Sequence, residues 1–314
     1  MPTITVPDDA PPVLAPSAVW PELLSRAEVD YHDTLPGSEE RLLERIRDSE
    51  IIINIRSSCR FTAAVFDQCP RLRLLSIWGT GTDNVDLPAA ARHGVTVTNT
   101  PGVSAPSIAE HCLALLLAVA RRIPRLDADV RGGAWPRGRM MQLEGKTLGV
   151  IGLGAVGRRF AALGAAVGMR VIAWTPHPNP ALGFRLVELD QLLASSDVVS
   201  LHLRLSPETE GLIGRRELAR MKPQAILLNT ARGPIVDEPA LVDALAAGRL
   251  AGAGLDVFTS EPLAAGHPLS RLEHVVLTPH CAGITPEALE AGLRMAVENV
   301  WAFLEGSPRH VVVG

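Results

Sequence analysis

The sequence predicts an α/β protein of two domains, each built on a parallel sheet, the larger of which is doubly wound. Two observations support this prediction. From Leu148 to Leu277, six short apolar runs alternate with helical segments. The first hundred residues show the same alternation in a shorter form. We place the smaller domain in residues 1–99 and 284–314 and the larger domain in residues 100–283.

Bulk composition narrows the class of protein. The 314 residues are 47% hydrophobic and 20% charged, and the net charge of −4 gives no electrostatic basis for binding nucleic acid or an anionic membrane. The N-terminal stretch lacks the apolar core of a signal peptide, and no apolar run is long enough to span a bilayer. The four cysteines show no C-x-x-C spacing, so we expect reduced thiols, no metal site and a cytoplasmic protein.

The elements of the smaller domain are short. Its expected strands are Ile51–Ile55, Leu72–Ile77 and Val95–Val97. "SEERLLERIRD" (Ser38–Asp48) predicts a helix that Ser38 caps, with three apolar residues on one face. The segment Pro101–Pro124 predicts a helix that is apolar on nearly every face, which must be covered on all sides. A position between domains or in a subunit interface fits such a helix best.

The larger domain shows a regular alternation. Its expected strands are Leu148–Ile151, Val171–Trp174, Val198–Leu203, Ala225–Leu228, Ala253–Leu255 and Val275–Leu277. Pro239 and Gly248 bound one of the intervening helices. The final segment, Thr285–Gly306, is a long amphipathic helix. We expect this helix to pack back on the smaller domain.

Three glycines after the first strand of the larger domain form a G-x-G-x-x-G motif. Gly152, Gly154 and Gly157 follow a strand and open a helix, which is the context that dinucleotide binding requires. The first glycine permits a tight turn, the second lets the backbone approach a pyrophosphate, and the third lets the helix pack closely on the strand. The helix N-terminus adds partial positive charge. The motif therefore predicts a Rossmann domain that binds NAD or NADP.

The end of the second strand leaves the nucleotide preference open. An acidic residue that bonds the ribose of NAD is expected about 20 residues beyond the glycines, and Thr175 occupies this position. No carboxylate is present to repel the 2′-phosphate of NADP, and no arginine stands beside Thr175 to bind it. We favour NAD, with NADP tolerated.

Arg232, Glu261 and His280 each follow one of the last three strands. Ligands of open α/β sheets bind outside the carboxyl ends of the strands, so residues far apart in sequence converge there. A guanidinium offers paired donors that match a carboxylate and polarise the adjacent ketone of a 2-keto acid. Histidine exchanges a proton near neutral pH, and a carboxylate on its ring favours the protonated form. The set predicts hydride transfer between a nicotinamide and a 2-keto acid.

Six ordered stretches resemble the D-specific 2-hydroxyacid dehydrogenases over almost the full chain. They are "GTGTDNVD" (Gly79–Asp86), "NTPGVSAPSIAEHCLALLLA" (Asn99–Ala118), "GLGAVG" (Gly152–Gly157), "NTARGPIVDEPAL" (Asn229–Leu241), "GLDVFTSEPL" (Gly254–Leu263) and "HPLSRLEHVVLTPHCAG" (His267–Gly283). The resemblance implies a Rossmann cofactor domain, a smaller flavodoxin-like substrate domain, and an enzyme of the phosphoglycerate dehydrogenase or hydroxypyruvate-glyoxylate reductase type. It also implies a homodimer joined largely through the cofactor domain.

The resemblance assigns roles to single residues. Arg232 is the substrate carboxylate ligand, His280 the acid/base and Glu261 its partner. Asp256 lies near the nicotinamide carboxamide. The expected cofactor contacts are Gly152, Gly154, Ala155, Val156, Gly157, Trp174, Thr175, Pro176, Leu203, Thr209, Thr230, Ala231, Asp256, His280 and Gly283. The expected substrate contacts are the backbone of Gly79, Thr80 and Gly81 and, as in phosphoglycerate-type members, Arg56 and Ser57. For Arg56, an exposed arginine at a strand end is the alternative interpretation.

Two other functions compete with 2-keto acid reduction. The same fold serves as a dinucleotide-sensing, corepressor-like scaffold in related proteins, and the intact Arg232, Glu261 and His280 favour an enzyme over this alternative. Phosphite oxidation on the same fold is a further alternative. Formate oxidation is disfavoured because formate enzymes carry glutamine where Glu261 stands.

Overall fold

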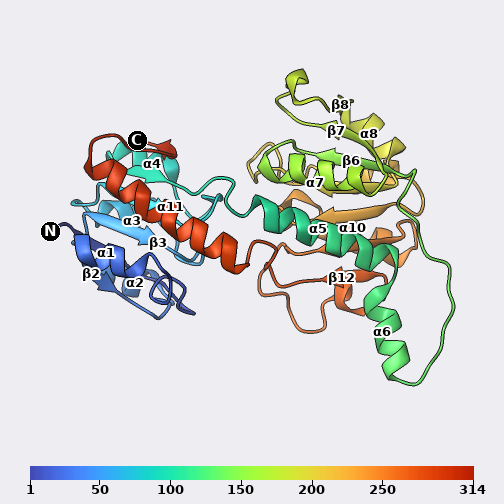
Figure 1. The fold of residues 1–314 in the computed structure, drawn as a ribbon, viewed down its shortest axis with the longest axis horizontal. Helices are drawn as coiled ribbons and strands as arrows, with labels where there is room; N and C mark the ends of the chain where they lie inside the picture. Colours follow the sequence, from blue (N-terminus) through green and yellow to red (C-terminus); the bar gives the residue numbers. More distant parts are fainter. The chain divides into compact units, whose positions relative to one another are not determined.

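The computed structural model describes the backbone of residues 1–314 and every side chain except that of Pro180. Helices and strands alternate throughout, and the chain divides into two compact units (Figure 1). The first unit joins Met1–Ser104 to Ile284–Gly314, and the second unit is Ala105–Gly283. Each unit has its own sheet, so the predicted α/β class is confirmed.

The first unit has a six-stranded sheet in the order β13-β5-β4-β3-β1-β2. Its strands are β1 (Thr3–Val6), β2 (Glu28–Tyr31), β3 (Ile51–Asn54), β4 (Leu74–Ile77), β5 (Thr96–Thr98) and β13 (Val311–Val313), and its helices are α1 (Trp20–Arg26), α2 (Glu39–Ile46), α3 (Ala63–Asp67), α4 (Leu87–Arg92) and α11 (Pro286–Leu304). Only β13 runs antiparallel to its neighbour. The five parallel strands follow the order 2-1-3-4-5, which is the flavodoxin-like order.

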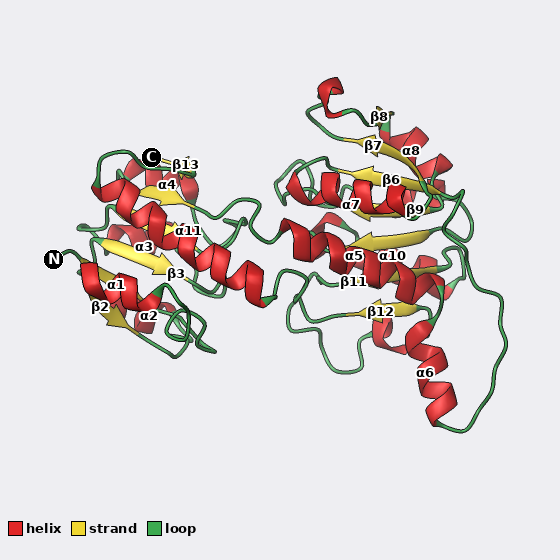
Figure 2. Cartoon of the chain, viewed as in Figure 1, coloured by secondary structure: helices red, strands yellow, loops and turns green.

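Helices cover both faces of this sheet (Figure 2). Helices α2, α3 and α4 pack on one face, and α1 and α11 pack on the other. Alternation along β3 shows the division, since Ile52 packs with α2 while Ile51 and Ile53 pack with α11. The prediction that the last helix returns to the smaller domain is therefore confirmed. Ser38 caps α2 as predicted, its side chain accepting from the N–H of Arg41.

The second unit has a seven-stranded, fully parallel sheet in the order β12-β11-β10-β9-β6-β7-β8. Its strands are β6 (Thr147–Ile151), β7 (Arg170–Trp174), β8 (Arg185–Leu186), β9 (Val198–Leu201), β10 (Ile226–Asn229), β11 (Gly252–Leu255) and β12 (Val275–Leu277). Its α-helices are α5 (Ala105–Ala120), α6 (Ile123–Arg131), α7 (Ala155–Ala166), α8 (Leu189–Ser195), α9 (Arg215–Arg220) and α10 (Glu238–Ala246), and short 3₁₀ turns η1 (Pro180–Leu182), η2 (Gly233–Ile235) and η3 (Pro268–Arg271) lie in the loops. The strand order reverses between β6 and β9, which marks a ligand-binding crevice in Rossmann sheets.

The faces of this sheet are covered by different helices. Helices α5 and α7 pack on one face, and α8, α9 and α10 pack on the other. Leu228 of β10 belongs to the first core, whereas the adjacent Leu227 belongs to the second. The doubly wound sheet predicted from the sequence is confirmed.

The segment predicted as one helix from Pro101 to Pro124 contains α5 and the start of α6. Arg122, with φ +52, separates the two helices, and Pro124 lies in the first turn of α6. A proline is tolerated there because first-turn N–H groups have no partner within the helix. Within this chain α5 is covered by the sheet and by α7, while Leu117 is 36% exposed.

Two further predictions concern cysteines and membrane helices. All four cysteines are free, as expected for reduced thiols. Among the described residues, no helix is both long and apolar enough to cross a membrane.

Candidate active site

The glycine-rich turn between β6 and α7 has the geometry that its sequence predicts. Gly152 has φ +99, and a Cβ there would lie 2.6 Å from the carbonyl oxygen of His202. A Cβ on Gly157 would lie 2.0 Å from the carbonyl oxygen of Gly152, so α7 packs directly on the turn. A Cβ on Gly154 would meet no atom within 4 Å. The turn and packing roles of the first and third glycines are confirmed, and open space remains beside Gly154.

The start of α7 fits the pyrophosphate of a dinucleotide. Gly154 is the N-cap residue of this helix, and no side chain caps it. The first-turn N–H groups therefore face an uncovered end of the helix, where an anion binds favourably. This end lies at the carboxyl edge of β6, beside the point where the strand order reverses.

Most other predicted cofactor residues lie at the carboxyl ends of neighbouring strands. Trp174 ends β7 and is followed by Thr175 and Pro176, Leu203 lies beyond β9, Thr230 and Ala231 follow β10, Asp256 follows β11, and His280 and Gly283 lie beyond β12. Thr209 differs, since its hydroxyl donates to the carbonyl of Arg204 at 2.7 Å and closes its own loop. Contact with a cofactor stays a prediction for each of them.

Asn229, the last residue of β10, fixes the loop that carries Arg232. Its Nδ2 donates to the Arg232 carbonyl at 2.9 Å, and its Oδ1 accepts from the N–H of Ala231 at 3.0 Å. The half-buried Arg232 donates from Nη1 to the Ala231 carbonyl at 2.8 Å. Asn229 is buried and was not among the predicted site residues, although it begins one of the resembling stretches.

Gly233 lets the Arg232 loop approach the loop that carries Glu261. A Cβ on Gly233 would lie 2.0 Å from the carbonyl carbon of Phe258 and 2.5 Å from the backbone nitrogen of Thr259. Both atoms are main chain, so neither can rotate away as a side chain can. Glycine is therefore required for the two loops to meet.

We expect Gly233→Ala to destabilise the fold and to separate these loops. Overpacking of this kind costs about 1–3 kcal/mol, and here the added methyl group meets backbone. Chemical denaturation would measure the free energy of unfolding. Gly154→Ala is the matched control, since a Cβ there meets no atom within 4 Å. Equal stability of the two variants would contradict the steric argument.

Glu261 and His280 form a direct hydrogen bond. Nδ1 of His280 lies 2.7 Å from Oε2 of Glu261, and Oε1 of Glu261 accepts from the N–H of Phe258 at 3.0 Å. The side chain of His280 is 43% exposed and that of Glu261 is 36% exposed, so the pair is open to solvent. Within the described part of the chain, no hydrogen bond engages Nε2 of His280. The second ring nitrogen is therefore available to a substrate.

The Glu261 carboxyl is held in its ionised form. Burial raises its pKa, but the hydrogen bonds from His280 and from the Phe258 N–H, together with the charges of His280 and Arg232, outweigh burial and lower the pKa below its ordinary value. An ionised partner stabilises a protonated imidazole. The structure thus brings Arg232, Glu261 and His280 together, while their catalytic roles stay predictions.

The backbone of His280 is held by Asp256. His280 has φ +51, in the left-handed region that few non-glycine residues adopt. Its N–H donates to the carbonyl of Asp256 at 2.8 Å. The Asp256 side chain bonds other residues of the same loop, and His111 of α5 joins this network through Thr278. Neither His111 nor Thr278 was singled out in the sequence.

In the first unit, Arg56 and Ser57 lie just beyond β3. Asp8, which is fully buried, accepts from the N–H of Arg56 at 2.9 Å and holds this turn. The Arg56 guanidinium donates to the carbonyl of Pro11 and lies 5.9 Å from the ring centroid of Trp78. Ser57 is exposed. The arginine is thus anchored rather than extended into solvent, and its substrate contact stays a prediction.

The Gly79–Gly81 turn follows β4 of the same unit. Gly79 has φ +142, and its N–H donates to Oγ1 of Thr100 at 2.8 Å. The Thr80 carbonyl accepts from Nδ2 of Asn99 at 2.8 Å. Among the described residues, no hydrogen bond engages the N–H groups of Thr80 or Gly81. The predicted substrate contact of this turn stays a prediction, and the Gly79 N–H is already hydrogen-bonded within the first unit.

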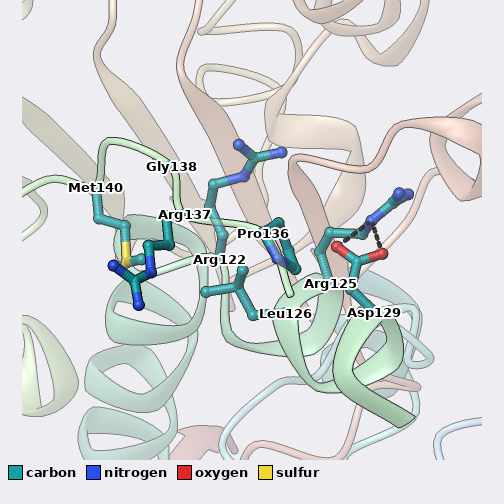
Figure 3. A pocket seen from close by; sticks show the side chains of 8 residues that line it. All are labelled: Arg122, Arg125, Leu126, Asp129, Pro136, Arg137, Gly138 and Met140. Atoms are coloured by element: carbon teal, nitrogen blue, oxygen red, sulfur yellow. Dashed lines mark hydrogen bonds and ion pairs between the residues drawn. The ribbon is translucent and has the colours of Figure 1, made fainter. Parts of the chain in front are cut away.

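A surface pocket of the second unit lies apart from the predicted site residues (Figure 3). It lies between α6 and the segment that follows that helix, and its lining residues are Arg122, Arg125, Leu126, Asp129, Pro136, Arg137, Gly138 and Met140. Arg125 donates to Asp129 one helical turn away at 2.9 Å. None of the predicted cofactor, substrate or catalytic residues lines this pocket.

The sequence of this chain is similar to those of known dehydrogenases and reductases. A family model described as D-isomer specific 2-hydroxyacid dehydrogenase, NAD binding domain, matches residues 113–282. Glyoxylate reductase of Aeropyrum pernix is 42% identical, over 94% of this chain and 93% of that protein. D-3-phosphoglycerate dehydrogenase of Archaeoglobus fulgidus is also 42% identical, but the matched region spans only 52% of its length.

Solved structures extend the similarity to both units. D-lactate dehydrogenase of Aquifex aeolicus, complexed with NAD and lactic acid, has a TM-score of 0.87 and 29% identity over 99% of each chain. An acyclic imino acid reductase in complex with NADPH and D-Arg has a TM-score of 0.92 and 31% identity, covering 99% of this chain and 100% of that chain. These two similar folds hold different nicotinamide cofactors.

Proposed function

This chain belongs to the D-isomer specific 2-hydroxyacid dehydrogenase family, and we propose that it interconverts a small 2-keto acid and the corresponding D-2-hydroxy acid. It is an oxidoreductase with an NAD-binding domain. The observation that carries the proposal is the 2.7 Å hydrogen bond between His280 and Glu261, beside an arginine close enough to lower the Glu261 pKa. The names of the relatives favour glyoxylate and hydroxypyruvate as substrates.

The residues of the turn after β6 would hold the cofactor. The N–H groups at the start of α7 would bind the pyrophosphate, and Gly154 leaves the space for it. Thr175, beyond β7, neither repels nor binds a 2′-phosphate, so we propose NAD as the preferred cofactor with NADP accepted. When bound, the nicotinamide supplies the hydride in reduction and takes it in oxidation.

Arg232, His280 and Glu261 have different proposed roles in the reaction. Arg232 binds the substrate carboxylate with paired donors and polarises the neighbouring ketone. His280 donates the proton from Nε2 to the carbonyl oxygen as negative charge develops there, and takes the proton back in the oxidation. Glu261 holds Nδ1, which fixes the tautomer and leaves Nε2 pointing away from the pair.

A panel of substrates tests this function. Glyoxylate, hydroxypyruvate and a phosphorylated 2-keto acid would be assayed with NADH and NADPH in parallel, and phosphite would be assayed with both oxidised cofactors. We expect turnover of at least one keto acid and none of phosphite. Cofactor binding without turnover of any keto acid would favour the corepressor-like scaffold.

Replacement of Glu261 should change the pH dependence of the reduction. The pKa of this carboxyl group is lowered, so its negative charge beside His280 is kept until the pH falls through the lowered value and is lost below it. Glu261→Gln has no titratable group at this position, so the acid limb that Glu261 contributes to the kcat profile should be absent. The profile would be measured at saturating NADH. An unchanged acid limb would show that the carboxylate does not support the proton donor.

We further propose that the chain forms a homodimer through its second unit. Helix α6 buries none of its side chains, and the segment from α6 to residue 140 extends away from the rest of this unit (Figure 1). It exposes Ile123, Val130, Trp135 and Met140, at 42% to 76% of each residue. Leu117 of α5 is a further exposed apolar residue of the same unit. A second copy is the occupant that the family resemblance implies.

Light scattering after gel filtration tests the dimer. The intact protein should have about twice the 33.5 kDa mass of one chain. Val130→Asp should shift the mass toward the monomer, because it places a charge in the apolar surface. Leu35→Asp is the control, since Leu35 has similar exposure and lies in the first unit. Equal dimerisation of the two variants would exclude this surface.

A further inference from the structure

The loop that carries Glu261 is exposed over most of its length. Residues 259–266 are all exposed except Leu263, which is half-buried. The Glu261 carboxylate accepts from the N–H of Phe258, just before this stretch, at 3.0 Å. Exposed backbone with few buried side chains opens at a low free-energy cost. Contacts at the ends of the loop therefore decide how firmly the Glu261 carboxylate is placed.

Glu238, in the first turn of α10, contacts both ends of this loop. Its Oε2 accepts from the N–H of Thr259 at 3.2 Å. Its Oε1 lies 3.4 Å from Nε2 of His267. The Glu238 side chain is 17% exposed and that of His267 is 21% exposed, so solvent screens these contacts only in part. A single carboxylate thus joins residue 259 to residue 267 across the loop.

The ring of His267 is oriented by a bond on its other side. Its Nδ1 accepts from the N–H of Leu269 at 3.3 Å, which caps the 3₁₀ turn η3. A ring nitrogen that accepts a hydrogen bond carries no proton, so the neutral ring has its proton on Nε2. This proton faces Oε1 of Glu238, and Oε2 of Glu238 remains for the N–H of Thr259.

The Glu238 contacts lie beside the junction of two catalytic loops. Glu238 follows Arg232 in the chain, with the 3₁₀ turn η2 between them. Gly233, next to Arg232, already packs on the backbone of Phe258 and Thr259. The bond from Thr259 to Glu238 is a second link between the same two segments. These links set the position of Glu261 relative to Arg232.

We propose that Glu238 is a positioning residue of the active site, which holds the Glu261 loop against the Arg232 loop and keeps the Glu261 carboxylate on Nδ1 of His280. The tether consists of the contacts of Glu238 with Thr259 and His267, and His267 orients the carboxylate within it. Neither Glu238 nor His267 needs to touch substrate or cofactor. The proposal rests on the proposed catalytic roles of Glu261 and His280.

Replacing Glu238 by alanine removes both contacts of the tether. We expect Glu238→Ala to lower kcat for keto acid reduction about tenfold, near the lower limit for loss of a hydrogen bond to a charged group. The Kd for NADH, from fluorescence titration, should stay within about twofold, because the cofactor contacts proposed for the turn after β6 are untouched. Glu238→Gln keeps an acceptor for the N–H of Thr259, so it should recover part of the kcat.

Glu217→Ala is the matched control for loss of stability. Glu217 also lies in the first turn of a helix of this unit, accepts from the N–H of Gly214 at 3.1 Å, and has a side chain that is 14% exposed. Its ion pair is with Arg216, not with the Glu261 loop. Glu217→Ala should leave kcat unchanged. An equal fall of kcat in Glu217→Ala and Glu238→Ala would overturn the proposal.

A double-mutant cycle with Glu261→Ala tests whether Glu238 acts through Glu261. Residues that act as one unit show non-additive effects, whereas independent residues show additive ones. Once the Glu261 carboxylate is absent, we expect Glu238→Ala to lower kcat no further. A tenfold fall of kcat in the Glu261→Ala background as well would overturn the proposal, because Glu238 would then act by another route.

Amide hydrogen exchange tests the tether without any substrate. The N–H of Phe258 bonds Glu261 and the N–H of Thr259 bonds Glu238, so both should exchange faster in Glu238→Ala than in Glu217→Ala or the unchanged protein. Unaltered exchange at Phe258 would overturn the proposal, since the Glu261 carboxylate would keep its place without the tether. If exchange accelerates while the unchanged protein turns over no keto acid, the tether stands and the proposed function fails, so the two failures are distinguishable.

Discussion

Replacing His280 by alanine is expected to lower kcat for keto acid reduction by about 10²–10⁴-fold, the range for loss of a general acid. The imidazole is bonded through Nδ1 to an ionised Glu261, so its Nε2 is the proton donor of the set. Binding of NADH should change little, because the pyrophosphate contacts proposed for the turn after β6 remain. Steady-state kinetics together with fluorescence titration of NADH would separate the two effects.

His93→Ala is the matched control for this experiment. His93 also bonds a carboxylate, that of Asp67 at 3.0 Å, but it lies on the surface of the first unit. Its replacement should leave kcat unchanged. If His280→Ala retained more than about a tenth of the kcat, proton donation by His280 would be excluded, since general acid catalysis contributes at least about 10²-fold.

Arg232→Lys is expected to lower kcat/KM by about 10–100-fold although it keeps the positive charge. A planar guanidinium gives two parallel donors to a carboxylate, whereas an ammonium is a point charge. Loss of one charge-assisted hydrogen bond costs about 1.5–3 kcal/mol, which corresponds to that range. The loop itself should persist, because Asn229 holds its backbone.

The comparison variant is Arg215→Lys. Arg215 pairs with Asp243 at 2.8 Å on the surface of the same unit. Its replacement should leave kcat/KM unchanged, since an exposed pair of this kind contributes little. Wild-type efficiency in Arg232→Lys would contradict the paired contact with the substrate carboxylate.

The sequence predicted the parts of the fold that have long periodic patterns. The doubly wound larger sheet was predicted from strands such as Ala225–Leu228, whose apolar runs are buried on both faces. Strands β1, β2, β8 and β13 were not predicted. They have two to four residues each, and β1, β2 and β8 mix polar with apolar residues, so they lack the continuous apolar run by which the other strands were identified.

The sequence predicted those site residues that have distinctive side-chain chemistry and also follow a predicted strand. Arg232, Glu261 and His280 are conspicuous residue types at strand ends, and the structure brings them together. Asn229, Thr278 and His111 were missed because their roles depend on hydrogen bonds that no spacing rule encodes. The occupied N–H of Gly79 could not be foreseen either, since Thr100 lies 21 positions away in sequence.

A crystal structure of the protein with NADH and oxamate, an unreactive analogue of a 2-keto acid, tests the central claim most directly. We expect Nε2 of His280 within hydrogen-bond distance, about 2.6–3.2 Å, of the carbonyl oxygen of the analogue. The guanidinium of Arg232 should contact its carboxylate, and Nδ1 of His280 should remain on Glu261. An imidazole turned away from the carbonyl oxygen, with neither a direct contact nor one bridging water, would contradict the account.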